Sequence, residues 1–175
     1  MGSFNRFAVV LCATAVLGGV GAGTAYADEY DHVDLVLEAF CDGNGDVSEG
    51  EFLLEEHGVG PLADQDQVFT FDGVDDTDLG FEVEWDDGCD QVPVDVTLTG
   101  ASGSGGSFSA GSVFSATAPS TLGATGPLTL SAANGYHLDP GAWTVSGGQT
   151  FDLSFTFSAT GGVPVVSTLP LHVAG

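Results

Sequence analysis

The sequence predicts a mainly β protein, an antiparallel β-sandwich preceded by a short helical, acidic N-terminal segment. From about residue 67 onward, apolar residues alternate with polar ones, which is the period of a half-buried strand. Gly, Asn, Asp, Ser and Pro separate these runs, as expected for turns. Before residue 62, two stretches carry apolar residues at helical spacing instead, and both lie in the most acidic part of the chain.

Residues 1–27 have the features of a secretory signal peptide. Arg6 is followed by the apolar run AVVLCATAVLGGVGAG, and residues 25–27, Ala-Tyr-Ala, form a small-residue cleavage signature. We therefore expect cleavage before Asp28 and a secreted protein, extracellular or associated with the cell surface. Lipidation at Cys12 is a less favoured alternative, because this cysteine lies inside the apolar run.

Charge is distributed unevenly along the chain. The sequence has 25 Asp and Glu residues against one Lys or Arg, a formal net charge of −24. Of the acidic residues, 23 fall in 28–95, and only Asp139 and Asp152 fall in 96–175. Without cationic side chains the protein cannot neutralise phosphates, so we expect no nucleic acid partner. No apolar run after residue 27 reaches the roughly 18 residues of a membrane helix, so no membrane insertion is expected.

The chain after the signal peptide is expected to divide into an acidic segment, 28–62, and a sandwich domain, 63–175. In the first, DHVDLVLEAF (31–40) and EGEFLLEEH (49–57) predict two short helices joined by a loop. Gly58 follows the second helix at a position where glycine often ends helices, and a nearby proline prevents continuation. The acidic segment is thus predicted to be a helix-loop-helix.

The second part contains about eight candidate strands. They are QVFTFD, FEVEWD, VPVDVTLTG, SVFSAT, GPLTLSA, GAWTVSG, QTFDLSFTFSAT and VPVVSTLPLHV. Residues 100–126 are rich in Gly and Ser and form either a flexible linker or short strands within the sandwich; Phe108 and Phe114 favour strands. We expect an antiparallel, Ig-like β-sandwich in which one face of each sheet is buried.

Cys41 and Cys89 are the two cysteines beyond the signal peptide. In an exported protein an even pair predicts a disulfide. It would tie the start of the DGNGD loop to the WDDGCDQ turn. The alternative, two thiols that act as metal ligands or catalytic groups, lacks a neighbouring Cys or His at ligand spacing.

Residues 42–52, DGNGDVSEGEF, place oxygen-bearing side chains at alternating positions around glycines. This stretch resembles the calcium-binding loop of the EF-hand, over these residues and the flanking helix candidates only. Phe40 stands where the first acidic ligand of that family belongs, so Asp90, brought near by the disulfide, is expected to supply an oxygen instead. The resemblance implies a calcium site whose ligands are Asp42, Asn44, Asp46, Ser48 and Glu51, with Gly45 at the sharp turn.

A local explanation competes with calcium binding. Ser48 and Glu51 have the spacing of a helix capping box, and Gly, Asp and Asn suit a tight turn. If calcium binds, we expect a weak, extracellular-type affinity of about 10⁻⁴–10⁻³ M. A second acidic stretch, 71–90, is expected to be a solvated rim, with a calcium cluster as the alternative.

The histidines offer a different metal site. His32 and His57 flank the two helix candidates, and with a carboxylate they form a conceivable zinc site. An exposed terminal position and a helix-end position explain them more simply. His137 lies in a predicted turn, and His172 lies near the end of the chain.

Catalysis has little support in the sequence: no G-x-S-x-G surrounds a serine, and a Ser-His-Asp triad could be assembled from the many serines only by chance. We therefore expect no catalytic residues and no enzyme. The function expected is that of a secreted interaction module, stabilised by calcium, with a protein or neutral polymer partner at the cell surface. The alternatives are a structural subunit of a surface layer or fibre and a small secreted hydrolase.

Overall fold

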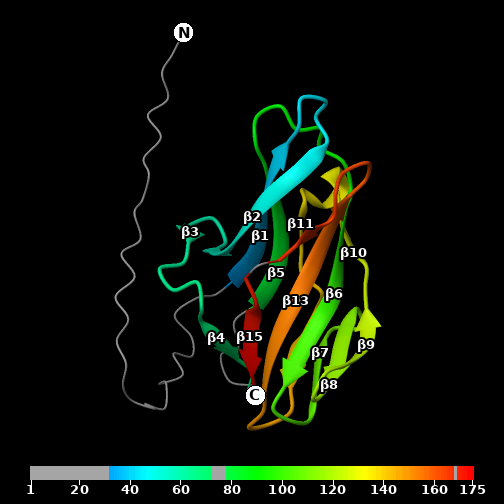
Figure 1. Cartoon of the computed structure of the whole chain (residues 1–175). Coiled ribbons are helices and arrows are strands. Elements are labelled where there is room, and N and C mark those ends of the chain that lie inside the picture. The colour runs from blue at the N-terminus through cyan, green and yellow to red at the C-terminus, as the bar shows by residue number, and fades with distance from the viewer. Residues whose placement is uncertain (1–31, 72–77, 168) are drawn as a thin grey trace, which may run out of the picture.

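The computed structural model describes residues 32–71, 78–167 and 169–175, and the protein is mainly β (Figure 1). Within these ranges the one helical element is a 3-10 turn, η1 (Ala132–Asn134). No helix in the described part of the chain is long and apolar enough to cross a membrane. The predicted signal peptide, and the cleavage site before Asp28, lie outside the described residues.

The strands form three sheets, which we call the first, second and third sheets. The first has the order β11-β5-β1-β2-β3 and contains β1 (His32–Cys41), β2 (Val47–Glu56), β3 (Gly60–Pro61), β5 (Asp78–Trp85) and β11 (His137–Leu138). The second has the order β10-β6-β13-β15-β4, with β14 beside β13; it contains β4 (Val68–Thr70), β6 (Val94–Gly103), β10 (Leu128–Leu130), β13 (Thr150–Ala159), β14 (Val165–Val166) and β15 (Leu171–Ala174). The third has the order β12-β7-β8-β9, with β7 (Ser107–Ala110), β8 (Phe114–Thr117), β9 (Thr121–Thr125) and β12 (Trp143–Val145).

Both helices predicted for the acidic segment are wrong, because these stretches form the antiparallel strands β1 and β2. β1 lies between β2 and the parallel strand β5, and side chains on both of its faces are buried. Val33, Leu35 and Leu37 are buried on one face, and Val36 is buried on the other. A strand buried on both faces has apolar residues at consecutive positions, and such a run also satisfies helical spacing.

The strands predicted in the second part of the chain are confirmed, since each of the eight predicted stretches contains an observed strand. Residues 100–126 contribute β7, β8 and β9 and are therefore not a linker. Strand pairing also crosses the boundary expected near residue 62, because β1 pairs with β5 from His32 opposite Asp78 to Ala39 opposite Trp85.

The three sheets share one apolar core. Phe81 on β5 lies 4.8 Å from Phe155 of the second sheet and 5.7 Å from Phe114 of the third, between ring centroids. Trp143 is buried in the same core and donates its indole N–H to the Leu79 carbonyl oxygen at 2.8 Å. The face of the first sheet that carries Phe81 packs against the other two sheets, and we call it the inner face. The opposite, outer face carries polar side chains such as Asp34 and Glu38.

The disulfide predicted between Cys41 and Cys89 is confirmed, with Cα atoms 5.3 Å apart. It joins the end of β1 to the loop after β5. Beside it, the backbone N–H of Asp90 donates to the Gly45 carbonyl oxygen at 2.9 Å. The disulfide thus brings the two acidic turns together, as the sequence indicated.

Candidate metal centre

The outer face of the first sheet carries rows of acidic residues. Asp34 lies opposite Glu55, and Glu38 lies between Glu51 on β2 and Glu84 on β5. Like charges directly opposite one another destabilise a sheet. The chain's single Lys or Arg belongs to the first 27 residues, so only histidines can place a cationic side chain of the described protein on this face.

These neighbours change the proton affinity of the central carboxylates. Burial raises the pKa of Glu38, and the negative charges of Glu51, Glu84 and Asp86 raise it further. Burial likewise raises the pKa of Glu55, with added contributions from the acidic residues around it. Glu38 and Glu55 therefore hold protons more readily than isolated carboxylates do.

We expect the folded protein to gain stability as the pH falls from neutral toward 4.5, the ordinary pKa of a Glu side chain. A carboxyl with a raised pKa in the folded state contributes stability that is fully present below its unfolded pKa, and that is lost as the pH rises through its folded pKa. Urea denaturation at a series of pH values measures this dependence. Glu38→Gln should flatten it, because glutamine stays neutral at every pH, whereas the exposed Glu49→Gln is the matched control. An unchanged slope in Glu38→Gln contradicts this account.

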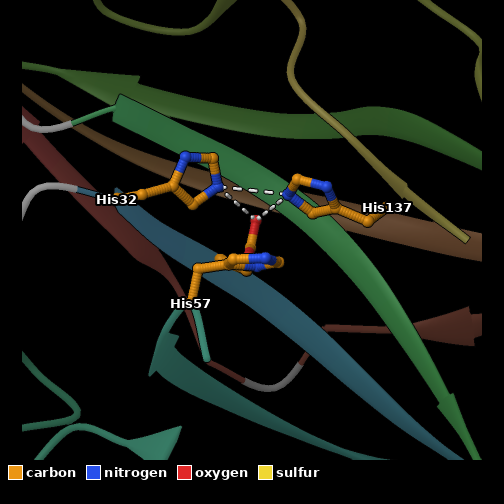
Figure 2. Close-up of side chains that lie close together, drawn as sticks. His32, His57 and His137 are labelled. Atoms are coloured by element: carbon orange, nitrogen blue, oxygen red, sulfur yellow. Dashed lines mark hydrogen bonds and ion pairs between the residues drawn. The ribbon is translucent and has the colours of Figure 1, made fainter. Parts of the chain in front are cut away.

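At one end of the same face, three histidines surround the carboxylate of Asp34. His32 and Asp34 are two residues apart on β1, so their side chains share a face. His57 follows β2, and its backbone N–H donates to the His32 carbonyl oxygen at 3.1 Å. His137 lies on β11, opposite Glu82 of β5. Figure 2 shows His32, His57 and His137 converging from these separate segments.

The polar atoms of the cluster lie close together. Asp34 is fully buried, and its Oδ1 lies 3.1 Å from Nε2 of His32 and 3.1 Å from Nε2 of His137. The two nitrogens are also 3.1 Å apart. The other oxygen of Asp34, Oδ2, lies 3.2 Å from Nδ1 of His57. Nε2 of His32, Nε2 of His137 and Oδ1 of Asp34 thus form a triangle. The two imidazoles have at most two N–H groups to donate within it, so hydrogen bonds cannot form along all three of its edges. One cation, in contrast, attracts the lone pairs of all three atoms.

Asp139 brings a further oxygen to the cluster. Its Oδ1 lies 3.5 Å from Nε2 of His32 and 3.8 Å from Nε2 of His137. This oxygen is buried and has no hydrogen-bond partner among the described residues. Burial raises the pKa of Asp139; Asp78 and Asp34 raise it as well, whereas His32 and His137 lower it. Burial, more than the neighbouring charges, thus sets the pKa of Asp139.

Gly80 on β5 makes the convergence of the two carboxylates sterically possible. It pairs with Asp34 on β1. A Cβ atom at this position would collide with Oδ1 of Asp34 and with Oδ1 of Asp139. Glycine at this position thus leaves room for both oxygens.

Two more carboxylates lie near the imidazoles. Oδ2 of Asp78 lies behind the His32 ring, 3.7 Å from its Nδ1, whereas Oε2 of Glu82 lies 3.9 Å from Nδ1 of His57, the nitrogen that also faces Asp34. Burial raises the pKa of Glu82, as does Asp34, while the two nearest histidines lower it. Carboxylates placed behind imidazoles are common at metal sites, where they orient the rings.

The residues predicted to bind calcium lie elsewhere. Asp42, Asn44 and Asp46 form the turn between β1 and β2, and Oδ1 of Asp42 accepts backbone N–H groups of Asn44 at 2.8 Å and Asp46 at 3.3 Å. The Asn44 backbone N–H lowers the pKa of Asp42. Asp90 lies against this turn, since a Cβ at Gly45 would be 3.0 Å from its Cγ. The turn is therefore ordered by its own hydrogen bonds.

The remaining two predicted ligands do not form a helix cap. Ser48 lies on β2 and donates its hydroxyl to the Phe40 carbonyl oxygen at 3.3 Å. Glu51 lies on the outer face of the first sheet, opposite Glu38. The predicted capping box is therefore wrong, because both residues belong to a strand. Part of the second acidic stretch, residues 72–77, lies outside the described residues.

In the described ranges, the groups of His, Cys, Asp and Glu whose ligand atoms gather within 4.8 Å both contain His32. They are His32, Asp34, His57 and His137, and His32, Asp78 and Asp139. The sequence suggested His32 and His57 with an unspecified carboxylate, but missed Asp34, His137 and Asp139. One signal was present: HVD at 32–34 and HLD at 137–139 repeat the pattern His-x-Asp, which on a strand places both side chains on one face.

Comparison of the chain with protein-family models, with curated proteins and with solved structures finds no match in any of the three.

Proposed function

We propose that this protein is a secreted, non-catalytic module with an Ig-like β-sandwich architecture that binds a divalent transition-metal ion at the cluster of His32, Asp34, His57 and His137. The observation that carries the proposal is the triangle of two imidazole nitrogens and one carboxylate oxygen, each 3.1 Å from the others, around a fully buried Asp34. Buried charges are tolerated when they are paired or when they coordinate metals.

The donor atoms favour a transition metal over calcium or magnesium. Imidazole nitrogen suits zinc, copper, iron and nickel, whereas calcium and magnesium prefer sites built from oxygen. The acidic outer face also raises the local concentration of cations near the site.

The charge around the cluster favours binding over catalysis. Asp34, Asp78, Asp139 and Glu82 together exceed the two positive charges of a divalent ion. These carboxylates would more than neutralise the charge of a bound ion. The ion would therefore be a weak Lewis acid and would not attract anionic substrates. Catalytic zinc sites have three protein ligands and one open position, and more groups than that converge here.

Two observations support secretion. The first 27 residues have signal-peptide features, and the chain contains a disulfide, a bond that persists in oxidising compartments.

Zinc binding to the disulfide-intact protein tests the proposal. We expect calorimetry to show one zinc ion per chain, and zinc at 100 times its dissociation constant to stabilise the fold by about 2.7 kcal/mol. His137→Gln should weaken binding strongly. His172→Gln is the matched control, because His172 lies on the second sheet between Asp152 and Asp66, at 2.7 and 2.9 Å. If millimolar zinc produces neither heat nor stabilisation in the wild type, the proposal is wrong.

Calcium at the β1–β2 turn is a second, separate proposal. The position of Asp90 against Gly45 supports it, because this carboxylate lies close enough to the turn to add an oxygen ligand. Calorimetry with calcium, compared between the wild type and Asp46→Asn, separates this turn from the histidine cluster.

A further inference from the structure

We infer that the ion is held tetrahedrally by His32, His137, Asp34 and Asp139, and that His57 positions Asp34 without contacting the metal. This inference rests on the proposed function and names the class of ion: zinc, and ions that share its preference for four nitrogen and oxygen ligands. It also assigns Asp139 as a ligand, although this residue does not belong to the three-histidine group around Asp34.

Five of the six distances between the four ligand atoms are those expected of a tetrahedron. Zinc bonds to nitrogen and oxygen of about 2.0–2.1 Å place neighbouring tetrahedral ligands about 3.3–3.4 Å apart. The distances among Nε2 of His32, Nε2 of His137 and Oδ1 of Asp34 are 3.1 Å. Oδ1 of Asp139 lies 3.5 and 3.8 Å from the two nitrogens. The mean of these five edges, about 3.3 Å, agrees with the edge length of a four-coordinate zinc site.

The topology of the first sheet explains why these four groups meet. β5 lies between β11 and β1. β1 carries His32 and Asp34, whereas β11 carries His137 and Asp139 directly follows it. Gly80 lies on the middle strand beneath the two aspartate oxygens. The ion would thus be held by two His-x-Asp pairs that meet above Gly80.

His57 has a different relation to the cluster. Its Nδ1 contacts Oδ2 of Asp34, not the Oδ1 that faces the other two imidazoles. Half of its side chain is exposed, compared with 21% for His32 and 26% for His137. A group bonded to the remote oxygen of a ligating carboxylate orients that ligand, and loss of such a group typically weakens metal binding by about 10–100-fold.

Cobalt(II) absorption of the disulfide-intact protein tests the ligand set, because four-coordinate Co²⁺ absorbs visible light much more intensely than six-coordinate Co²⁺. We expect the intense spectrum in the wild type. Asp139→Asn should abolish it and weaken zinc binding by more than about 100-fold, beyond the effect of a positioning residue. His57→Gln should retain the intense spectrum and weaken zinc binding by no more than about 100-fold. His172→Gln should behave as wild type.

Different outcomes distinguish this inference from the proposed function. If His57→Gln loses the intense spectrum while Asp139→Asn keeps it, His57 is the ligand and the inference is overturned, although metal binding stands. If the wild type binds zinc but shows only the weak cobalt spectrum, the tetrahedral geometry is wrong. If neither ion binds, the proposed function fails as well. Gly80→Ala gives an independent check, because its methyl group would displace both aspartate oxygens and should abolish the intense spectrum.

Discussion

Replacing Cys41 and Cys89 together by serine is expected to lower the free energy of unfolding by about 4 kcal/mol. The disulfide links residues separated by 48 positions, and in the chain-entropy model a loop of this length greatly restricts the unfolded chain. Domains of this size are typically stable by about 5–15 kcal/mol, so the loss is a large fraction of the total. Urea denaturation of the oxidised wild type and the double variant measures it.

The reduced wild type is the natural control for this experiment. Its stability should equal that of the double variant, because both lack the same covalent link. A difference of less than about 1 kcal/mol between the oxidised wild type and the variant would contradict the assigned role of the bond.

The same variant separates the disulfide from the proposed metal centre. Cys41 ends β1 and His32 begins it, so the two features are about 30 Å apart along an extended strand. We therefore expect the folded double variant to bind zinc as tightly as the wild type.

Phe81→Ala is expected to lower the free energy of unfolding by about 3–5 kcal/mol. The Phe81 ring is fully buried and contacts aromatic rings of the second and third sheets. Truncation leaves a cavity at the point where the three sheets meet. Denaturation experiments should show a smaller loss for Phe81→Leu, and a change within about 0.5 kcal/mol for Val163→Ala, whose side chain is exposed.

Phe81→Ala should also weaken zinc binding, unlike removal of the disulfide. Phe81 follows Gly80 on β5 and pairs with Leu35 of β1 and Leu138 of β11. β1 carries one His-x-Asp pair and β11 carries the histidine of the other, so a cavity beneath β5 loosens the spacing between the two pairs. An unchanged zinc affinity in a folded Phe81→Ala protein would show that core packing does not set the geometry of the site.

The second part of the fold was predictable because its strands are buried on one face only. In Thr150–Ala159, for example, Phe151, Leu153, Phe155 and Phe157 are buried and alternate with polar residues. β1 lacks this signal because side chains on both of its faces are buried. Its apolar residues therefore matched the helical period, and the EF-hand resemblance drew on that same helical interpretation.

The candidate site was less predictable than the strands. His32 and Asp34 are a local pair, and so are His137 and Asp139, but about a hundred residues separate the two pairs. They meet only because β1 and β11 both pair with β5, one in parallel and one antiparallel, in the registers observed. No local pattern specifies such a register.

The sequence by itself determined the β content of the second part, the cysteine pairing and the excess of negative charge, because alternation, residue counts and charge are local or additive properties. Only the tertiary structure decided that β1 and β2 are strands, that Gly80 lies beneath two carboxylates, and that three of the four histidines share one site. The physical reason is that burial of both faces of β1, and the registers of β1 and β11 against β5, depend on contacts between distant segments.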